Sequence, residues 1–89
     1  MDADSGDRKQ PTEEEIREES HRARRLQFLV SLVMNVISQS QDMPVEEAAE
    51  LVASTKRAAL AMFPDKEFAF DIIYRPRLQR LMAEKYGIQ

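Results

Sequence analysis

Chemically versatile side chains are few and scattered in this chain. The only histidine, His21, lies in a charged segment, and no cysteine or second histidine stands at a spacing that could complete a metal site. It also lacks the neighbouring nucleophile that a catalytic base needs. Glu46, Glu47 and Glu50 have the spacing of one helix face, a pattern typical of solvated surface. We therefore expect no catalytic residue, no metal site and no cofactor, in a protein that is not an enzyme.

Arg75, Arg77 and Arg80 form the most concentrated basic group in the last third of the sequence. One interpretation is an anion-binding patch, because Pro76 predicts a helix start whose backbone N–H groups favour negative charge. A nucleic-acid-associated regulator that uses residues 75–80 is then an alternative function. The other interpretation is that the arginines form ion pairs with neighbouring acids such as Asp71, and we favour it.

The overall composition also argues against a dedicated nucleic-acid binder. The 89 residues carry a net charge of −3, and the sequence pI is about 5.1, whereas nucleic-acid-binding domains usually have a pI above about 9. The absence of cysteine excludes disulfides, thiolate-bound zinc and iron–sulfur centres. No transmembrane segment is expected, and we expect a cytoplasmic protein.

Prolines mark where the elements that position these residues begin. Proline is tolerated in the first turn of a helix, because its missing N–H has no helical partner there. The four prolines lie at positions 11, 44, 64 and 76, and Gly87 follows the last apolar stretch as a helix stop. The sequence thus predicts an all-α fold, a small bundle of three to four helices with a long first helix, completed by self-association. We expect residues 1–11 to be a disordered acidic tail and residues 12–89 to be the helical domain.

The first helix is expected from about Thr12 to about Ser40, with Thr12 and Glu15 forming a capping box. A second helix is expected from about residue 44 to residue 63. The segment 66–74 is ambiguous, because Phe68 and Phe70 alternate as in a strand. We prefer a helix there, since the chain has no second strand to pair with it. A break is expected before Pro76, where a last helix begins and runs to about residue 86.

Residues 26–37 are the most apolar part of the first helix, yet they are too short to span a bilayer. At about 100° per residue the polar side chains of this segment fall on one narrow stripe, and the apolar ones cover an arc of roughly 240°. An arc of that width predicts burial against several neighbours. The candidate interface residues, which would face a single neighbouring helix, are Leu29, Leu32, Val33 and Val36, with Phe28 at the margin of this group.

These observations predict a small non-enzymatic interaction module that self-associates or binds a partner helix through residues 26–37. A homo-oligomer, with a dimer favoured, is expected because so small a chain without disulfides or metal often needs association for stability. Peripheral membrane binding through residues 22–30 is a further alternative. Lys56 lies within the apolar arc of the second helix, and we expect its ammonium group to reach solvent rather than pair with a facing acid.

Overall fold

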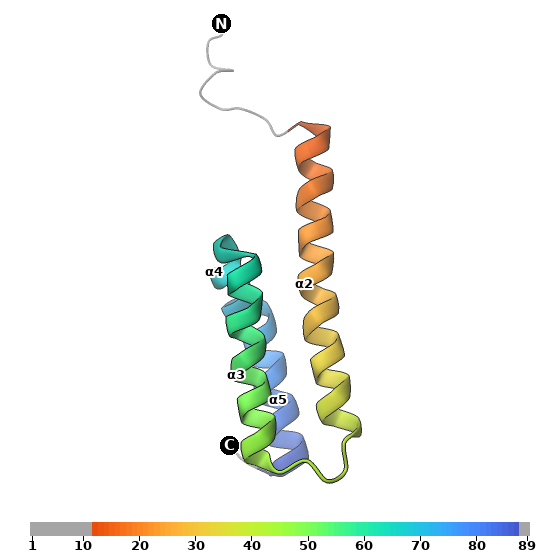
Figure 1. Ribbon diagram of the computed structural model, residues 1–89, viewed down its shortest axis with the longest axis vertical. Helices are drawn as coiled ribbons and strands as arrows, with labels where there is room; N and C mark the ends of the chain where they lie inside the picture. The colour runs from red at the N-terminus through yellow and green to blue at the C-terminus, as the bar shows by residue number, and fades with distance from the viewer. Residues whose placement is uncertain (1–11, 88–89) are drawn as a thin grey trace, which may run out of the picture.

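Three helices dominate the structure, a computed structural model that describes residues 12–87 (Figure 1). They are α2 (Glu13–Gln39), α3 (Val45–Met62) and α5 (Arg75–Tyr86). A 3-10 turn (Pro64–Lys66), the short helix α4 (Glu67–Ala69) and a π-helical segment (Phe70–Tyr74) connect α3 to α5. The described residues contain no strand, which confirms the all-α prediction and the helical interpretation of residues 66–74. The predicted tail, residues 1–11, lies outside the described range.

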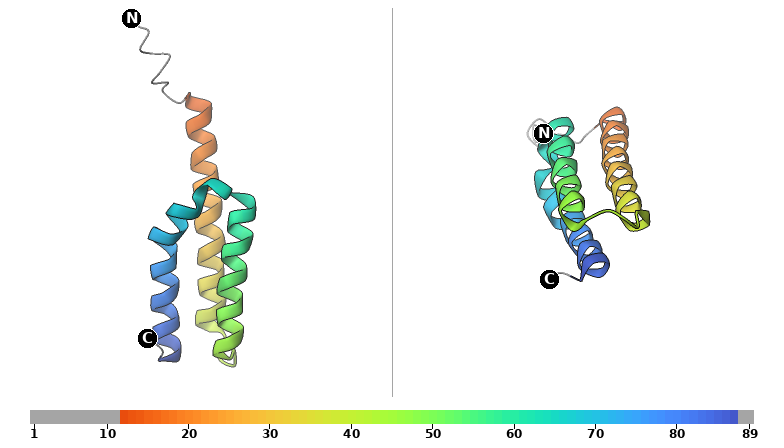
Figure 2. Two further views of the ribbon diagram at one scale, coloured as in Figure 1. Left: turned by 90° about the vertical axis from the view of Figure 1, so that its left-hand side faces the viewer. Right: turned by 60° about the horizontal axis from the view of Figure 1, so that its bottom comes forward.

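Helix α2 is the long first helix that the sequence predicts, with a length of about 40 Å at 1.5 Å per residue. The capping box is present: Thr12 Oγ1 accepts the Glu15 N–H at 3.0 Å, and the Glu15 carboxylate accepts the Thr12 N–H at 2.9 Å. The N-terminal part of α2 extends beyond the ends of α3 and α5 (Figures 1 and 2). This part is therefore a helical arm with few neighbours.

Two ion pairs connect the base of this arm to the turn after α3. Arg22 donates to Asp65 at 3.0 Å, and Lys66 donates to Glu19. The Arg22 guanidinium also lies 5.9 Å from the centre of the Phe63 ring. Each exposed pair contributes only about 0 to 1 kcal/mol, so these contacts orient the arm more than they stabilise the fold.

The predicted break before Pro76 is wrong. Helix α4, the π segment and α5 follow one another directly, and Arg75 has helical backbone angles of φ −58° and ψ −45°. In a regular α-helix the Pro76 ring would clash with the carbonyl of Ile72. The π segment instead bonds the Arg75 N–H to the Phe70 carbonyl, five residues earlier, and its wider turn accommodates the proline without ending the helix.

The core lies between one face of α2 and the α3–α5 pair. Helix α2 contributes four buried side chains, spaced as one narrow helical face: Leu26, Val30, Val33 and Ile37. Their main partners are Ala48 and Ala59 from α3, Phe63, Phe70 from the π segment, and Leu78 and Met82 from α5. The chain itself therefore buries only part of the broad apolar arc of residues 26–37.

Lys56 ties α3 to the π segment, contrary to our expectation of a solvent-directed ammonium group. Its Nζ lies 2.8 Å from Asp71 Oδ1 and 5.9 Å from the centre of the Phe70 ring. Arg75 approaches the same carboxylate at 3.8 Å. The hydrogen bond from Lys56, with smaller contributions from the charges of both cations, lowers the pKa of Asp71 below its usual range.

Candidate functional site

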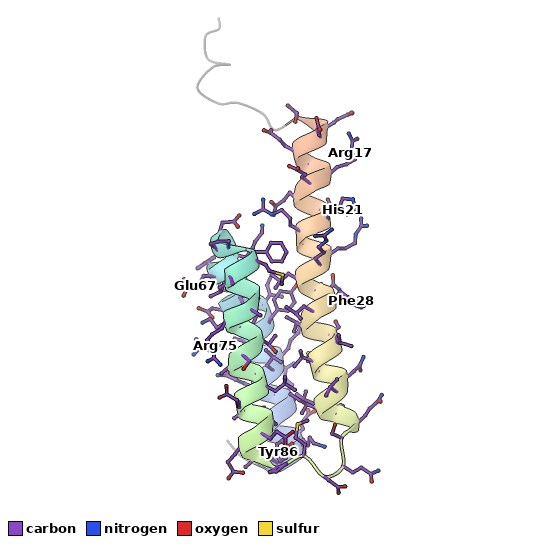
Figure 3. The ribbon with its side chains drawn as sticks, in the orientation of Figure 1. Arg17, His21, Phe28, Glu67, Arg75 and Tyr86 are labelled. Carbon is purple, nitrogen blue, oxygen red and sulfur yellow. The ribbon has the colours of Figure 1, made fainter. Side chains whose placement is uncertain are left out.

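Three of the four large apolar residues of α2 that the chain leaves exposed form one continuous row; the fourth, Ile16, lies on the arm. Phe28, Leu32 and Val36 are 69%, 49% and 42% exposed, and they follow one another at intervals of four residues. Side chains at this spacing lie next to one another on one face of a helix. Figure 3 shows Phe28 pointing away from α3 and α5. We call Phe28, Leu32 and Val36 the outer stripe.

The other two predicted interface residues have different surroundings. Val33 is only 7% exposed and packs with Ile37, Ala48 and Met82 in the core. Leu29 is half-buried against the core cluster around Leu26. The structure thus places three of the five predicted residues together on the surface, leaves Leu29 at their margin, and assigns Val33 to the interior.

The two ends of the outer stripe differ in charge. Towards the N-terminus, His21, Arg24 and Arg25 are exposed and, together with Phe28, border a shallow depression. Towards the C-terminus, the last turn of α2 carries no basic residue of its own, although Lys85 of α5 donates to the carbonyl of the C-cap residue Ser40 at 2.8 Å. The exposed Asp42 follows this turn. The C-terminal carbonyl groups of a helix carry about half a negative charge. The apolar row therefore has a basic end and an opposite end where Asp42 and the helix carbonyls are negative, partly offset by Lys85.

The predicted anion-binding arginines do not converge. Arg75 lies beside Asp71, whereas the Arg77 guanidinium lies 6.0 Å from the centre of the Tyr74 ring. Arg80 is exposed on α5. Because the helical path continues through Pro76, the N–H groups that a free helix start would present to an anion are largely absent. This geometry favours the interpretation of intramolecular contacts.

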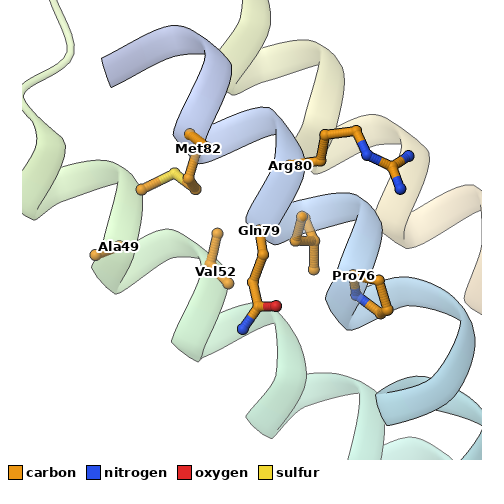
Figure 4. A pocket seen from close by; sticks show the side chains of 8 residues that line it. Ala49, Val52, Pro76, Gln79, Arg80 and Met82 are labelled. Atoms are coloured by element: carbon orange, nitrogen blue, oxygen red, sulfur yellow. The ribbon is translucent and has the colours of Figure 1, made fainter. Parts of the chain in front are cut away.

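A groove of about 670 Å³ lies between α3 and α5, on the side where Gln79 points towards α3 (Figure 4). Its floor includes Leu78 and Met82, which are already buried in the core. The exposed side chains along it are small or polar, such as Ala49 and Gln79. A ligand in this groove would cover much less new apolar surface than a partner on the outer stripe.

A second group of exposed apolar side chains, whose exposure the sequence does not predict, lies near the π segment. Phe68 is 77% exposed, Ile72 is 55% exposed and Ile73 is 44% exposed. Phe68, Ile72 and Ile73 have helical spacing in the sequence, but this spacing does not show that they point away from the core. The three residues span α4 and the π segment, where the helix changes its winding. They lack the straight, regular backbone that supports the outer stripe.

Helix α2 and the other described helices are too short or too polar to cross a membrane. Comparison with known proteins yields no family model, no curated protein and no solved structure that matches this chain.

Proposed function

We propose that this protein is a non-enzymatic interaction module that docks an apolar helix face of another protein molecule on the outer stripe of α2. The observation that carries the proposal is the alignment of Phe28, Leu32 and Val36, all exposed, along one regular helix. Single exposed apolar residues are common on protein surfaces, whereas a contiguous row of large ones is typical of an interaction site.

The exposed apolar area supports docking of modest strength. A phenylalanine side chain buries about 150–250 Å² when fully covered. At 69% exposure, covering Phe28 removes on the order of 100 Å² or more from water, which corresponds to about 2 to 4 kcal/mol at 25 cal/mol per Å². Leu32 and Val36 contribute less, because roughly half of each is already covered. Docking also costs translational and rotational entropy, so we expect a reversible complex.

The shape of the surface favours a helix as the docked element. A row of side chains at i, i+4 and i+8 forms one of the ridges that fit into the groove of a facing helix. Leu29 borders this ridge as a half-buried apolar neighbour. Polar side chains, Ser31 and Asn35, are exposed on its other side and would form a hydrophilic rim.

A displayed library of amphipathic helices with randomised apolar faces tests the proposal even though the natural partner is unidentified. We expect selection on the immobilised protein to recover helices whose apolar residues repeat at i, i+4 and i+8. Their binding should be lost with Leu32→Glu, because docking would bury an unpaired charge. Ile73→Glu is the matched control, since Ile73 is 44% exposed, close to the 49% of Leu32, and lies outside the outer stripe.

Two results would contradict the proposal. One is that selection recovers no binding helix from the library. The other is that the recovered helices bind the Leu32→Glu protein as tightly as they bind the parent, because their docking site then lies elsewhere.

A further inference from the structure

The outer stripe has its two end residues at equal distances from Leu32, but the side chains of these two residues differ in size. Phe28 and Val36 each lie four residues from Leu32, about 6 Å along the helix axis and about 40° around it. Phe28 is large and Val36 is small. We infer that the helix docked on the outer stripe is α2 of a second copy of this chain, antiparallel to the first, with a two-fold axis at Leu32. This inference rests on the proposed function and specifies its partner.

The sizes of the three side chains favour the antiparallel arrangement. An antiparallel copy centred on Leu32 places each Phe28 opposite Val36 of the other chain, so both pairs combine one large and one small side chain. A parallel copy would place Phe28 opposite Phe28 and Val36 opposite Val36. The two Phe28 side chains would then hold the helices so far apart that the two Val36 side chains could not touch. Alternation of large and small side chains across an interface gives the denser packing.

The charges flanking the stripe favour the same arrangement. Arg25 and Gln39 each lie seven residues from Leu32, on nearly the same line of the helix surface. An antiparallel copy therefore places Arg25 near the C-terminal turn of the other α2. There the exposed Asp42 and the helix carbonyls other than that of Ser40, which Lys85 already contacts, attract a cation. A parallel copy would place Arg25 opposite Arg25, and like charges at one level destabilise such a contact.

The inferred dimer is weak. Three side chains on each copy cover much less than the roughly 800 Å² per partner that standard stable interfaces bury. We therefore expect rapid exchange between monomer and dimer, and measurements need protein at roughly hundreds of micromolar.

Disulfide trapping tests the orientation directly, because the chain has no cysteine of its own. Two single-cysteine proteins, Arg25→Cys and Gln39→Cys, are mixed at equal concentration and oxidised slowly, so that monomers and dimers exchange many times before a disulfide forms. Both positions are exposed and lie outside the stripe. In the heterodimer, Arg25→Cys removes one of the two Arg25 contacts, and the Gln39→Cys protein retains the other. Intact-mass spectrometry separates the heterodimer from the two homodimers. A nearly antiparallel pair, with helix axes crossing at a small angle, brings position 25 of one copy close to position 39 of the other. It keeps identical positions about 21 Å apart along the axis, well beyond disulfide reach.

The expected result is a proportion of heterodimer clearly above the roughly 2:1:1 ratio of heterodimer to each homodimer that random pairing gives, because only the positions 25 and 39 come within disulfide reach. Adding Leu32→Glu to both proteins should reduce the yield to the statistical mixture of random collision, whereas adding Ile73→Glu should preserve the excess. An excess of homodimers would overturn the antiparallel orientation, and a statistical mixture in the parent background would overturn a second copy as the partner. Neither result would contradict docking of other helices, which the displayed library measures separately.

Discussion

The difference between Phe68 and Phe70 offers the sharpest prediction about how the chain folds. Phe70 is 1% exposed and packs against Leu26, Val30 and Leu78, whereas Phe68 is 77% exposed. Truncation of a buried phenylalanine to alanine costs about 3 to 5 kcal/mol. An 89-residue chain is stabilised by about 4 to 13 kcal/mol at 0.05–0.15 kcal/mol per residue. We therefore expect Phe70→Ala to remove a large part of the free energy of unfolding.

Phe68→Ala is the matched control, with the same chemical change two residues earlier. Its effect should stay within about 0.5 kcal/mol, as for most surface substitutions. Urea unfolding followed by far-UV circular dichroism, at a protein concentration low enough to avoid association, gives both values. In a strand, residues 68 and 70 would lie on the same face. Equal destabilisation by the two substitutions would therefore refute the helical winding described for this segment.

Two further substitutions test the Lys56–Asp71 ion pair and the C-terminal cap of α5. Asp71 has a lowered pKa in the folded protein, so its contribution to stability is present above its usual value of 3.8 and is lost as the pH falls through the lower folded value. The difference in unfolding free energy between the parent and Asp71→Asn should accordingly be largest near neutral pH and shrink in acid; a difference independent of pH would contradict the Lys56–Asp71 pair. Gly87 ends α5 with φ +67°, where a side chain strains the backbone, and a Cβ there would meet no atom within 4 Å. Gly87→Ala should therefore cost about 1 kcal/mol in urea unfolding, and an unchanged midpoint would show that this cap does not matter.

Local signals predicted the ends of the helices well. The capping box at Thr12, the proline before α3 and the glycine after α5 each act within a few residues, so the sequence contains the whole of their physical cause. Pro76 was misjudged because the usual cost of proline in a helix assumes regular winding. The π segment removes that clash, and nothing local to Pro76 indicates its presence.

The apolar periodicity of the sequence locates the candidate surface, but it does not show which of the apolar residues are exposed and which are buried. It identifies residues 26–37 as too apolar for a simple surface helix and places Leu29 beside Val36, with Leu32 and Val33 flanking them. Val33 was grouped with them because the arc is almost continuously apolar. Which part of the arc faces the chain's own core depends on where α3 and α5 pack, a tertiary property that a helical wheel does not contain.

The central claim is that the outer stripe of α2 docks a second copy of the chain, and sedimentation equilibrium tests it most directly. The parent, Leu32→Glu and Ile73→Glu proteins are compared from low micromolar to roughly millimolar concentration. We predict that the average mass of the parent and of Ile73→Glu rises from the 10.3 kDa of one chain towards twice that value, while Leu32→Glu stays at 10.3 kDa. A parent that remains at 10.3 kDa throughout, or a Leu32→Glu protein that associates like the parent, would contradict the claim.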